Sequence, residues 1–183
     1  MNKPVKKISG RILLNNKGFS LLELMIVSSF ILLFLGASAL YGNKFIANDE
    51  LVSSQKALLS INSDTRSSFK GRGNFLGLTN VIANNLGIFP PDMVNGTGAT
   101  LTVQNKYNGT VTLQVNASNN LLQEQIWGGI PKEACMKLAL FSPDTWITVD
   151  VNGTAIDPNA DTAMTDVDGA CNLANNTLTW NSN

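Results

Sequence analysis

The hydrophobic pattern divides the chain into an apolar segment, an amphipathic segment and a longer region in which polar and apolar positions alternate. Residues 24–43 contain no charged side chain and consist mostly of Leu, Ile, Val, Phe, Met and Ala. As a helix, this segment would be about 30 Å long, which is enough to cross the hydrocarbon core of a bilayer. We therefore predict a membrane-spanning helix here.

Past this segment, apolar residues continue to recur with helical spacing. Leu51 and Leu58, like Val52 and Leu59, are seven residues apart and share one face of a helix, with polar and charged residues between them. No proline interrupts residues 19–69. The pattern predicts one long helix over this range, apolar all round in its first half and amphipathic in its second half.

Turn-forming residues then introduce a region of short helices and strands. Two glycines end the long helix within residues 70–74, and Thr79 can cap a short helix that reaches about Leu86. Alternating residues on both sides of Asn108-Gly109 predict a hairpin with a type I′ turn. The remaining predictions are a short helix at 131–140, a strand at 146–151 that turns at Asn152-Gly153, and a strand at 177–180. The fold class is α+β.

The residues around the start of the apolar segment form a motif. Residues 1–17 contain five Lys or Arg and no acid, which is typical of a flank that stays in the cytoplasm. Glu23 stands at the head of the apolar run, where an unpaired carboxylate would be costly. The segment KGFSLLELMIV, residues 17–27, resembles the processing site of type IV prepilins.

This resemblance implies processing by a prepilin peptidase and methyltransferase, which would cut between Gly18 and Phe19 and N-methylate Phe19. It implies a leader peptide at 1–18, a membrane and filament-core half of the helix at 19–44, and a globular head domain at 45–183. The expected type IV pilin fold places the amphipathic half of the helix on an antiparallel sheet and lets the apolar half protrude. Glu23 is implied to pair with the N-terminal amine of a neighbouring subunit.

Two further stretches resemble the type IVb pilins of thin conjugative or bundle-type pili. FKGRGNF, residues 69–75, is similar to the loop after the long helix, and the order of elements around the two cysteines is also similar. The resemblance favours a major pilin that forms a helical homopolymer, with implied roles in adhesion, bundling or conjugation. The prepilin would lie in the inner membrane with its head in the periplasm, and an assembly platform would then build the extracellular filament.

Charge and composition narrow the possible functions. Outside the leader, thirteen acidic residues outnumber eight basic ones, so no basic stripe suits nucleic-acid binding. The chain contains no His, which excludes a catalytic His and a His metal ligand. It also lacks a nucleophile elbow and a Gly-rich phosphate loop. We expect a structural protein without a cofactor, not an enzyme.

The cysteines Cys135 and Cys171 lie far from the apolar segment. In a domain outside the cytoplasm, two cysteines predict a disulfide, and two unpaired buried thiols are the alternative. The loop between them is long enough for the bridge to stabilise the domain by about 3–4 kcal/mol in the chain-entropy model.

One acidic loop has partial calcium-loop spacing. Asp157, Asn159 and Asp161 match the first ligands, and Asp168 is the twelfth residue of the pattern. Thr162 stands where the pattern requires Gly, and Asp168 is shorter than the usual Glu. We favour a solvated acidic loop, with calcium as the weaker alternative and no other metal expected.

Other interpretations of the N-terminus and of the function stay open. Ala37-Ser38-Ala39 fits the cleavage site of an ordinary secretory signal peptide, and an unprocessed membrane anchor is a second possibility. A mature chain that begins at Leu40 would indicate a secreted domain, whereas one that begins at methylated Phe19 would indicate a pilin. The functional alternatives are a minor pilin, a type II secretion pseudopilin and a signal-anchored periplasmic binding protein.

Overall fold

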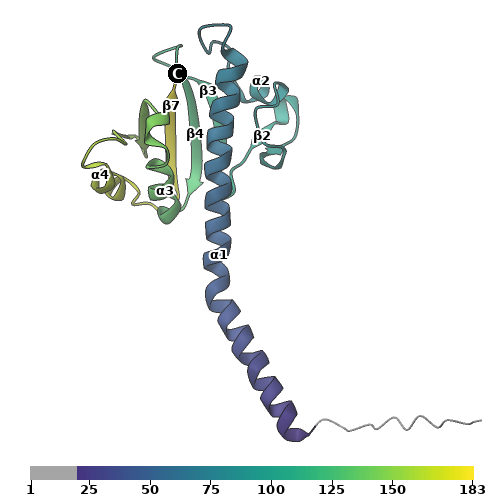
Figure 1. The fold of residues 1–183 in the computed structure, drawn as a ribbon. Coiled ribbons are helices and arrows are strands. Elements are labelled where there is room, and N and C mark those ends of the chain that lie inside the picture. Colours follow the sequence, from purple (N-terminus) through teal and green to yellow (C-terminus); the bar gives the residue numbers. More distant parts are fainter. Residues whose placement is uncertain (1–19) are drawn as a thin grey trace, which may run out of the picture. The chain divides into compact units, whose positions relative to one another are not determined.

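The computed structural model describes the backbone of residues 20–183 and the side chains of residues 20–32 and 48–183. It divides into two units, residues 1–43 and residues 44–183, which are described separately below. Gly18 and Phe19 lie outside the described residues. The second unit contains the sheets and the short helices that the structure describes, and it is called the head (Figure 1).

The first element is a single α-helix, α1, with bounds Leu21–Phe69. It confirms the long helix predicted from the hydrophobic spacing. The helix ends in a turn in which the amide of Arg72 donates to the carbonyl of Phe69, and Gly73 adopts a φ of 70° that favours glycine. Among the described residues, no helix is both long enough and apolar enough to cross a membrane. The predicted span at 24–43 includes residues 33–43, whose side chains lie outside the described part.

The head is built on a five-stranded antiparallel sheet in the order β3-β4-β7-β5-β6. The final strand of the chain therefore occupies the centre of the sheet. A separate pair, β1 and β2, forms a small antiparallel sheet. The strands are β1 (Val94–Asn95), β2 (Thr102–Val103), β3 (Val111–Val115), β4 (Gln123–Ile130), β5 (Thr148–Val151), β6 (Thr154–Ile156) and β7 (Asn176–Ser182).

Three short α-helices and three 3-10 turns complete the head. In Figure 1 the head portion of α1 runs alongside the sheet, with α2 and β2 to one side of it and α3 and α4 to the other. This α+β arrangement of a long N-terminal helix and an antiparallel sheet is the predicted fold class. The elements are α2 (Asn80–Asn85), α3 (Lys132–Ala139), α4 (Ala163–Ala170), η1 (Pro91–Met93), η2 (Gly98–Thr100) and η3 (Pro143–Thr145).

The core joins α1 to the sheet through both apolar and polar contacts. Trp127 and Trp180 are fully buried and pack edge to face, with ring centroids 5.8 Å apart. Beside them, the buried amide of Gln123 donates to Asn62 on α1 and to Ser182 on β7, and the Ser182 hydroxyl donates to Asn62 Oδ1 at 2.6 Å. These bonds fix α1 against two strands because each polar group would be costly to bury without a partner.

The structure corrects the hairpin predicted around Asn108-Gly109. The flanking strands join different partners, since β2 pairs with β1 and β3 pairs with β4. The two arms are connected by an isolated bridge between Gln104 and Thr110 and by a hydrogen bond from the amide of Asn105 to the carbonyl of Gly109. Asn108 has a positive φ of 60° but Gly109 does not, so the turn is not type I′. Gly109 is required for space, because a Cβ there would lie 1.8 Å from the carbonyl oxygen of Gly128.

Two other turn predictions are confirmed. Asn152 and Gly153 have φ values of 53° and 84° and connect β5 directly to β6, as a type I′ turn does. Thr79 is the N-cap of α2, and its side chain accepts a hydrogen bond from the amide of Ile82.

Candidate functional site

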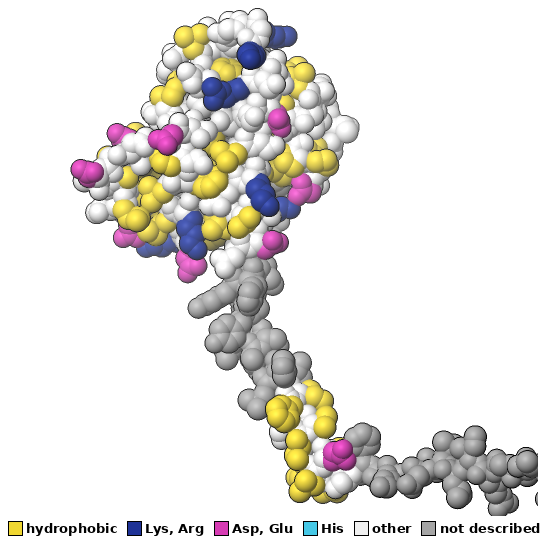
Figure 2. All heavy atoms as spheres, viewed as in Figure 1, with side chains coloured by type: hydrophobic (Ala, Val, Ile, Leu, Met, Phe, Trp, Pro, Cys, Tyr) yellow, Lys and Arg dark blue, Asp and Glu magenta, His cyan; other side chains and the backbone are white. Residues whose placement is uncertain are grey.

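The start of α1 places one carboxylate among exposed apolar side chains. Glu23 lies in the first turn of the helix, close to the point where the amide of Leu24 donates to the carbonyl of Ser20. An acidic residue in a first turn is favoured by the helix dipole. Figure 2 shows an acidic side chain, in magenta, next to hydrophobic side chains, in yellow, in this part of the helix.

Large apolar side chains cover every side of this part of the helix. They are between 48% and 80% exposed in the isolated chain. A soluble domain rarely leaves a continuous apolar surface of this kind without a lipid or protein partner. The exposed residues are Leu21, Leu22, Leu24, Met25, Ile26, Val27, Phe30, Ile31 and Leu32.

Glu23 has no ion pair or side-chain hydrogen bond with the described residues. Once lipid or neighbouring helices cover the apolar surface around it, its carboxylate loses water and must find a cationic partner. The arrangement is therefore suited to association, with one charge to fix the position of the partner. Gly18 and Phe19, the predicted processing residues, lie outside the described part of the chain.

The predicted disulfide is present and lies in the head. Cys135 on α3 and Cys171 at the end of α4 are bonded, with Cα atoms 5.9 Å apart and both residues fully buried. The bridge closes a sequence separation of 36 residues and ties the two helices together. It holds the segment that contains β5, β6 and α4 on the sheet.

Two carboxylates of the calcium-loop pattern contact other groups of the head. Asp157 Oδ1 accepts a hydrogen bond from the amide of Asn159, as in an ordinary turn. Asp168 lies on α4, where it is 3.8 Å from the ammonium of Lys132. Within the described residues, no group of three or more acidic or cysteine side chains is arranged to hold a metal ion.

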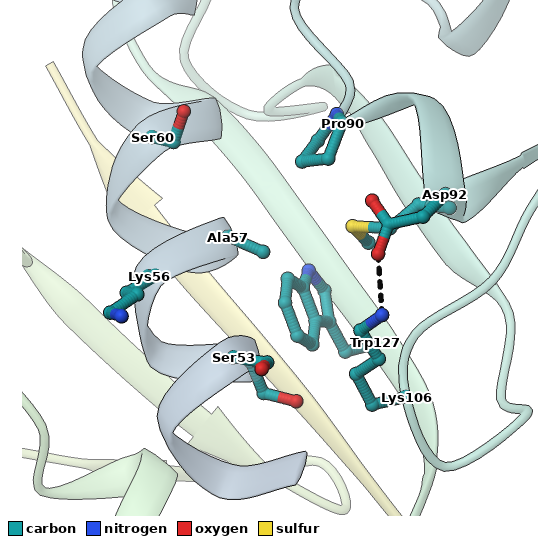
Figure 3. Close-up of a pocket in the computed structure, with 10 residues that line it drawn as sticks. Ser53, Lys56, Ala57, Ser60, Pro90, Asp92, Lys106 and Trp127 are labelled. Carbon is teal, nitrogen blue, oxygen red and sulfur yellow. Dashed lines mark hydrogen bonds and ion pairs between the residues drawn. The ribbon is translucent and has the colours of Figure 1, made fainter. Parts of the chain in front are cut away.

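A cavity of about 310 Å³ lies between α1 and the segment around η1. Figure 3 shows the indole of Trp127 between Ala57 of α1 and the ion pair of Asp92 and Lys106, while Lys56 points away. The floor of the cavity is lined by apolar side chains, and the ion pair lies at its rim. We interpret it as a gap in the packing between α1 and the segment around η1, which the ion pair holds in place. Sequence reasoning did not identify this pair, because the two residues are 14 positions apart and belong to different turns.

Two titratable groups near this cavity have shifted pKa values. The Lys106 ammonium, which donates a hydrogen bond to Asp92, holds the pKa of that carboxyl below its usual value. Burial raises the pKa of the Tyr107 hydroxyl above its usual value, because the phenolate would lose its hydration. Both shifts follow from local packing and not from a cluster of reactive groups.

Another residue that sequence reasoning missed protects the edge of the sheet. The side-chain amide of Asn80 donates to the carbonyl of Val111 at 2.8 Å and accepts from the amide of Leu113 at 2.7 Å. Asn80 thus bonds to the edge strand β3 as a neighbouring strand would, and it covers groups that could otherwise pair with another chain. The only sequence signal was an Asn after the Thr79 cap.

A comparison with protein families shows which family has this architecture. The family model described as PilS N terminal matches residues 48–183, which is nearly the whole head. The chain belongs to the PilS family of type IV pilins. No curated protein matches it.

Among solved structures, the pilin is similar to TcpA, a type IV pilin from Vibrio cholerae El Tor biotype. The two share 14% sequence identity and a TM-score of 0.55, over 74% of this chain and 99% of TcpA. At this identity the likeness shows a common fold. As a type IV pilin, the chain is a structural subunit of an extracellular pilus filament.

Proposed function

We propose that this pilin is the major subunit of a type IVb pilus and that it polymerises through the apolar half of α1. A prepilin peptidase removes residues 1–18, and the new N-terminal residue, Phe19, is N-methylated. Before assembly, the subunit lies in the inner membrane with its head in the periplasm. The assembly platform then transfers it to a filament in which neighbouring helices replace the lipid.

The observation that carries this proposal is the position of Glu23 at the head of the exposed apolar helix surface. Cleavage after Gly18 would create an ammonium group on Phe19, four residues before Glu23. A carboxylate and an ammonium buried in an apolar bundle each require the other, since an unpaired buried charge is strongly destabilising. Pairing between the Glu23 of one subunit and the Phe19 of the next also sets the axial step between subunits.

The first test concerns the processing site. Mass spectrometry of the wild-type subunit is expected to find a chain that begins at methylated Phe19. Gly18→Ala is expected to leave the leader attached to nearly all of the protein, whereas Gly10→Ala, a matched change within the leader, is expected to be processed normally. A mature chain that begins at Leu40, or normal trimming of Gly18→Ala, would contradict the proposed site.

The second test separates processing from assembly. Glu23→Ala is expected to be trimmed and methylated normally but to give at least about tenfold fewer filaments, because the amine loses its partner. Glu50→Ala removes the same side chain from the head portion of the same helix and is expected to assemble. A wild-type yield of filaments from Glu23→Ala would reject the pairing role.

The third test decides between a major and a minor pilin. Sheared surface filaments are resolved by electrophoresis and their main band is sequenced. A main band of this chain supports a major pilin, and a trace amount beside another main protein assigns it as a minor one. Adhesion, bundling and conjugation are then measured with a deletion strain and with the complemented strain.

A further inference from the structure

We propose that Asn95 is a site of spontaneous deamidation, at which the head converts slowly from an asparagine form to aspartate and isoaspartate forms. The reaction requires only water and the backbone of the protein. The inference goes beyond the proposed function, because it concerns the folded head and holds whether or not the chain polymerises.

An asparagine that precedes a glycine can react with its own backbone. The backbone nitrogen of the glycine attacks the side-chain carbon Cγ of the asparagine, and the side-chain nitrogen leaves as ammonia with the proton of the attacking amide. Water then opens the resulting succinimide ring at either of its two carbonyl carbons. One opening gives aspartate, and the other gives isoaspartate, in which the backbone runs through Cγ. Glycine favours the attack because it has no Cβ to shield the nitrogen and its backbone rotates freely.

The chain contains the tripeptide Asn-Gly-Thr three times, and each copy lies in a turn of the head. The copies are residues 95–97 between β1 and β2, residues 108–110 before β3, and residues 152–154 between β5 and β6. Because the three local sequences are identical, they should react at similar rates in an unfolded chain. A difference between them in the folded protein must therefore come from the tertiary structure.

At the first copy, both reacting atoms are free. Asn95 is exposed, and its side-chain amide donates only a long hydrogen bond, of 3.4 Å, to Gln104 Oε1. The amide nitrogen of Gly96 has no hydrogen-bond acceptor among the residues that the structure describes. The side chain of Asn95 can therefore rotate toward this nitrogen without losing a strong contact.

The turn also requires the reactive glycine. Gly96 has a φ of 77°, and a Cβ at this position would lie 2.5 Å from the carbonyl oxygen of Thr100. A larger residue would shield the backbone nitrogen, but it does not fit here. The reactivity of Asn95 is therefore a consequence of the shape of the turn between β1 and β2.

At the second copy, the attacking nitrogen is engaged. The amide of Gly109 donates to Asn105 Oδ1 at 3.0 Å, and Asn105 is itself buried and donates to the carbonyl of Gly128 at 2.8 Å. The backbone of Gly109 is also packed directly against that carbonyl. Asn108 is exposed, but the nitrogen that would attack it is held by a hydrogen bond in a closely packed turn.

At the third copy, the side chain is held. The amide nitrogen Nδ2 of Asn152 donates to the carbonyl of Ala170 at 2.9 Å and to Asn176 Oδ1 at 2.8 Å. Its oxygen Oδ1 accepts a hydrogen bond from the amide of Thr177 at 2.8 Å. Rotation of Cγ toward the backbone would break these bonds, so the fold protects Asn152.

The consequence of conversion at Asn95 is local. Either product adds a carboxylate to a chain region in which acids already outnumber bases. Isoaspartate also lengthens the backbone inside β1, where Asn95 pairs with Thr102 in a sheet of two short strands. The five-stranded sheet and its core do not include this pair, so the head should remain folded after conversion.

Peptide mapping of the full-length protein tests the proposal. The chain is purified in detergent, incubated folded at mildly alkaline pH in water labelled with heavy oxygen, then reduced and digested with trypsin. Cleavage after Arg72, Lys106, Lys132 and Lys137 places the three copies in separate peptides, and tandem mass spectrometry locates the converted residue in each. Asn95 is expected to convert at least about tenfold faster than Asn108 or Asn152, because breaking one hydrogen bond to reach the reactive geometry costs roughly that factor in rate.

Two controls separate the fold from the sequence. In denaturant with the disulfide reduced, the three copies are expected to convert at similar rates. The Asn95→Gln variant is expected to lose the fast reaction, because the longer side chain must close a larger ring. Equal rates at the three copies in the folded chain, an unconverted Asn95, or the same ratio of rates in folded and denatured protein would overturn the inference.

Discussion

The two ends of α1 are made of similar residues but are used in opposite ways. In the head, Leu58 and Ile61 are fully buried and Phe69 is 4% exposed, so the chain satisfies its own apolar surface. At the N-terminal end, Leu21 is 80% exposed and Phe30 is 62% exposed. The same helix therefore contributes buried residues to the core of the head at one end and leaves its apolar side chains exposed at the other.

This difference separates the stability of the subunit from the stability of the filament. Side chains in the head contribute to folding of the isolated subunit. Those around Glu23 contribute only when lipid or another subunit covers them, because exposed apolar area gives no stabilisation until it is removed from water. The predictions below test that separation, in order from the largest expected effect to the smallest.

Truncation of one phenylalanine in each region should affect different properties. Phe69→Ala is expected to lower the free energy of unfolding of the head by about 3–5 kcal/mol, because it removes a buried ring that packs against Phe75. Phe30→Ala is expected to leave head unfolding unchanged and to reduce filament yield. Denaturant unfolding and counts of sheared filaments provide the two measurements, and a large loss of head stability in Phe30→Ala would remove the distinction.

The disulfide should matter for the head alone. Cys135→Ser is expected to lower the free energy of unfolding by about 3–4 kcal/mol, because the reduced chain regains the entropy of a long loop. Wild-type protein in a reducing agent is the control and is expected to lose a similar amount. Equal melting temperatures of variant and wild type under oxidising conditions would show that the bridge does not stabilise the fold.

The two hydrogen bonds of Asn80 to the edge strand β3, called here the Asn80 clamp, should make a moderate contribution to the stability of the head. Asn80→Ala is expected to destabilise the head by about 2 kcal/mol, because it leaves the carbonyl of Val111 and the amide of Leu113 without their partner. The variant should also aggregate faster, since the edge of β3 becomes free to pair. Asn84→Ala on the same helix is the matched control. Thermal unfolding with light scattering follows both effects, and identical curves for the two variants would contradict the clamp.

The ion pair of Asp92 and Lys106 should contribute least. Its carboxyl has a lowered pKa, so the pair stabilises the head above the ordinary carboxyl pKa, and this stabilisation disappears as the pH falls through the lowered value. Asp92→Asn is expected to cost less than about 1 kcal/mol at neutral pH, because both side chains are solvated and salt screens them. The difference from wild type should vanish in acid, and a difference that persists there would have another cause.

The sequence predictions were correct where neighbouring residues decide the structure and failed where distant residues do. The long helix, the Thr79 cap and the Asn152-Gly153 turn were predicted because a few neighbouring residues decide them. The strand β4 was missed because its inward-facing positions include Gln123 and Gln125, which are buried polar residues and break the apolar alternation.

Two other elements depended on contacts that no local pattern reports. The helix α4 contains Thr, Asp and Gly, which are poor helix formers, and burial of Val167 and the bond at Cys171 hold it in place. The hairpin around Asn108 was wrong because β3 pairs with a strand further along the chain, which the turn residues could not indicate.

The sequence alone determined the long helix, its apolar first half, and Glu23 at the head of that half, because periodicity and charge can be read within one segment. Only the tertiary structure decided which strands pair, which polar side chains are buried, and which distant residues meet, such as Asp92 with Lys106 and Asn80 with β3. The physical reason is that such contacts join residues far apart in the chain. Their free energy depends on packing and desolvation, which exist only once the head has folded.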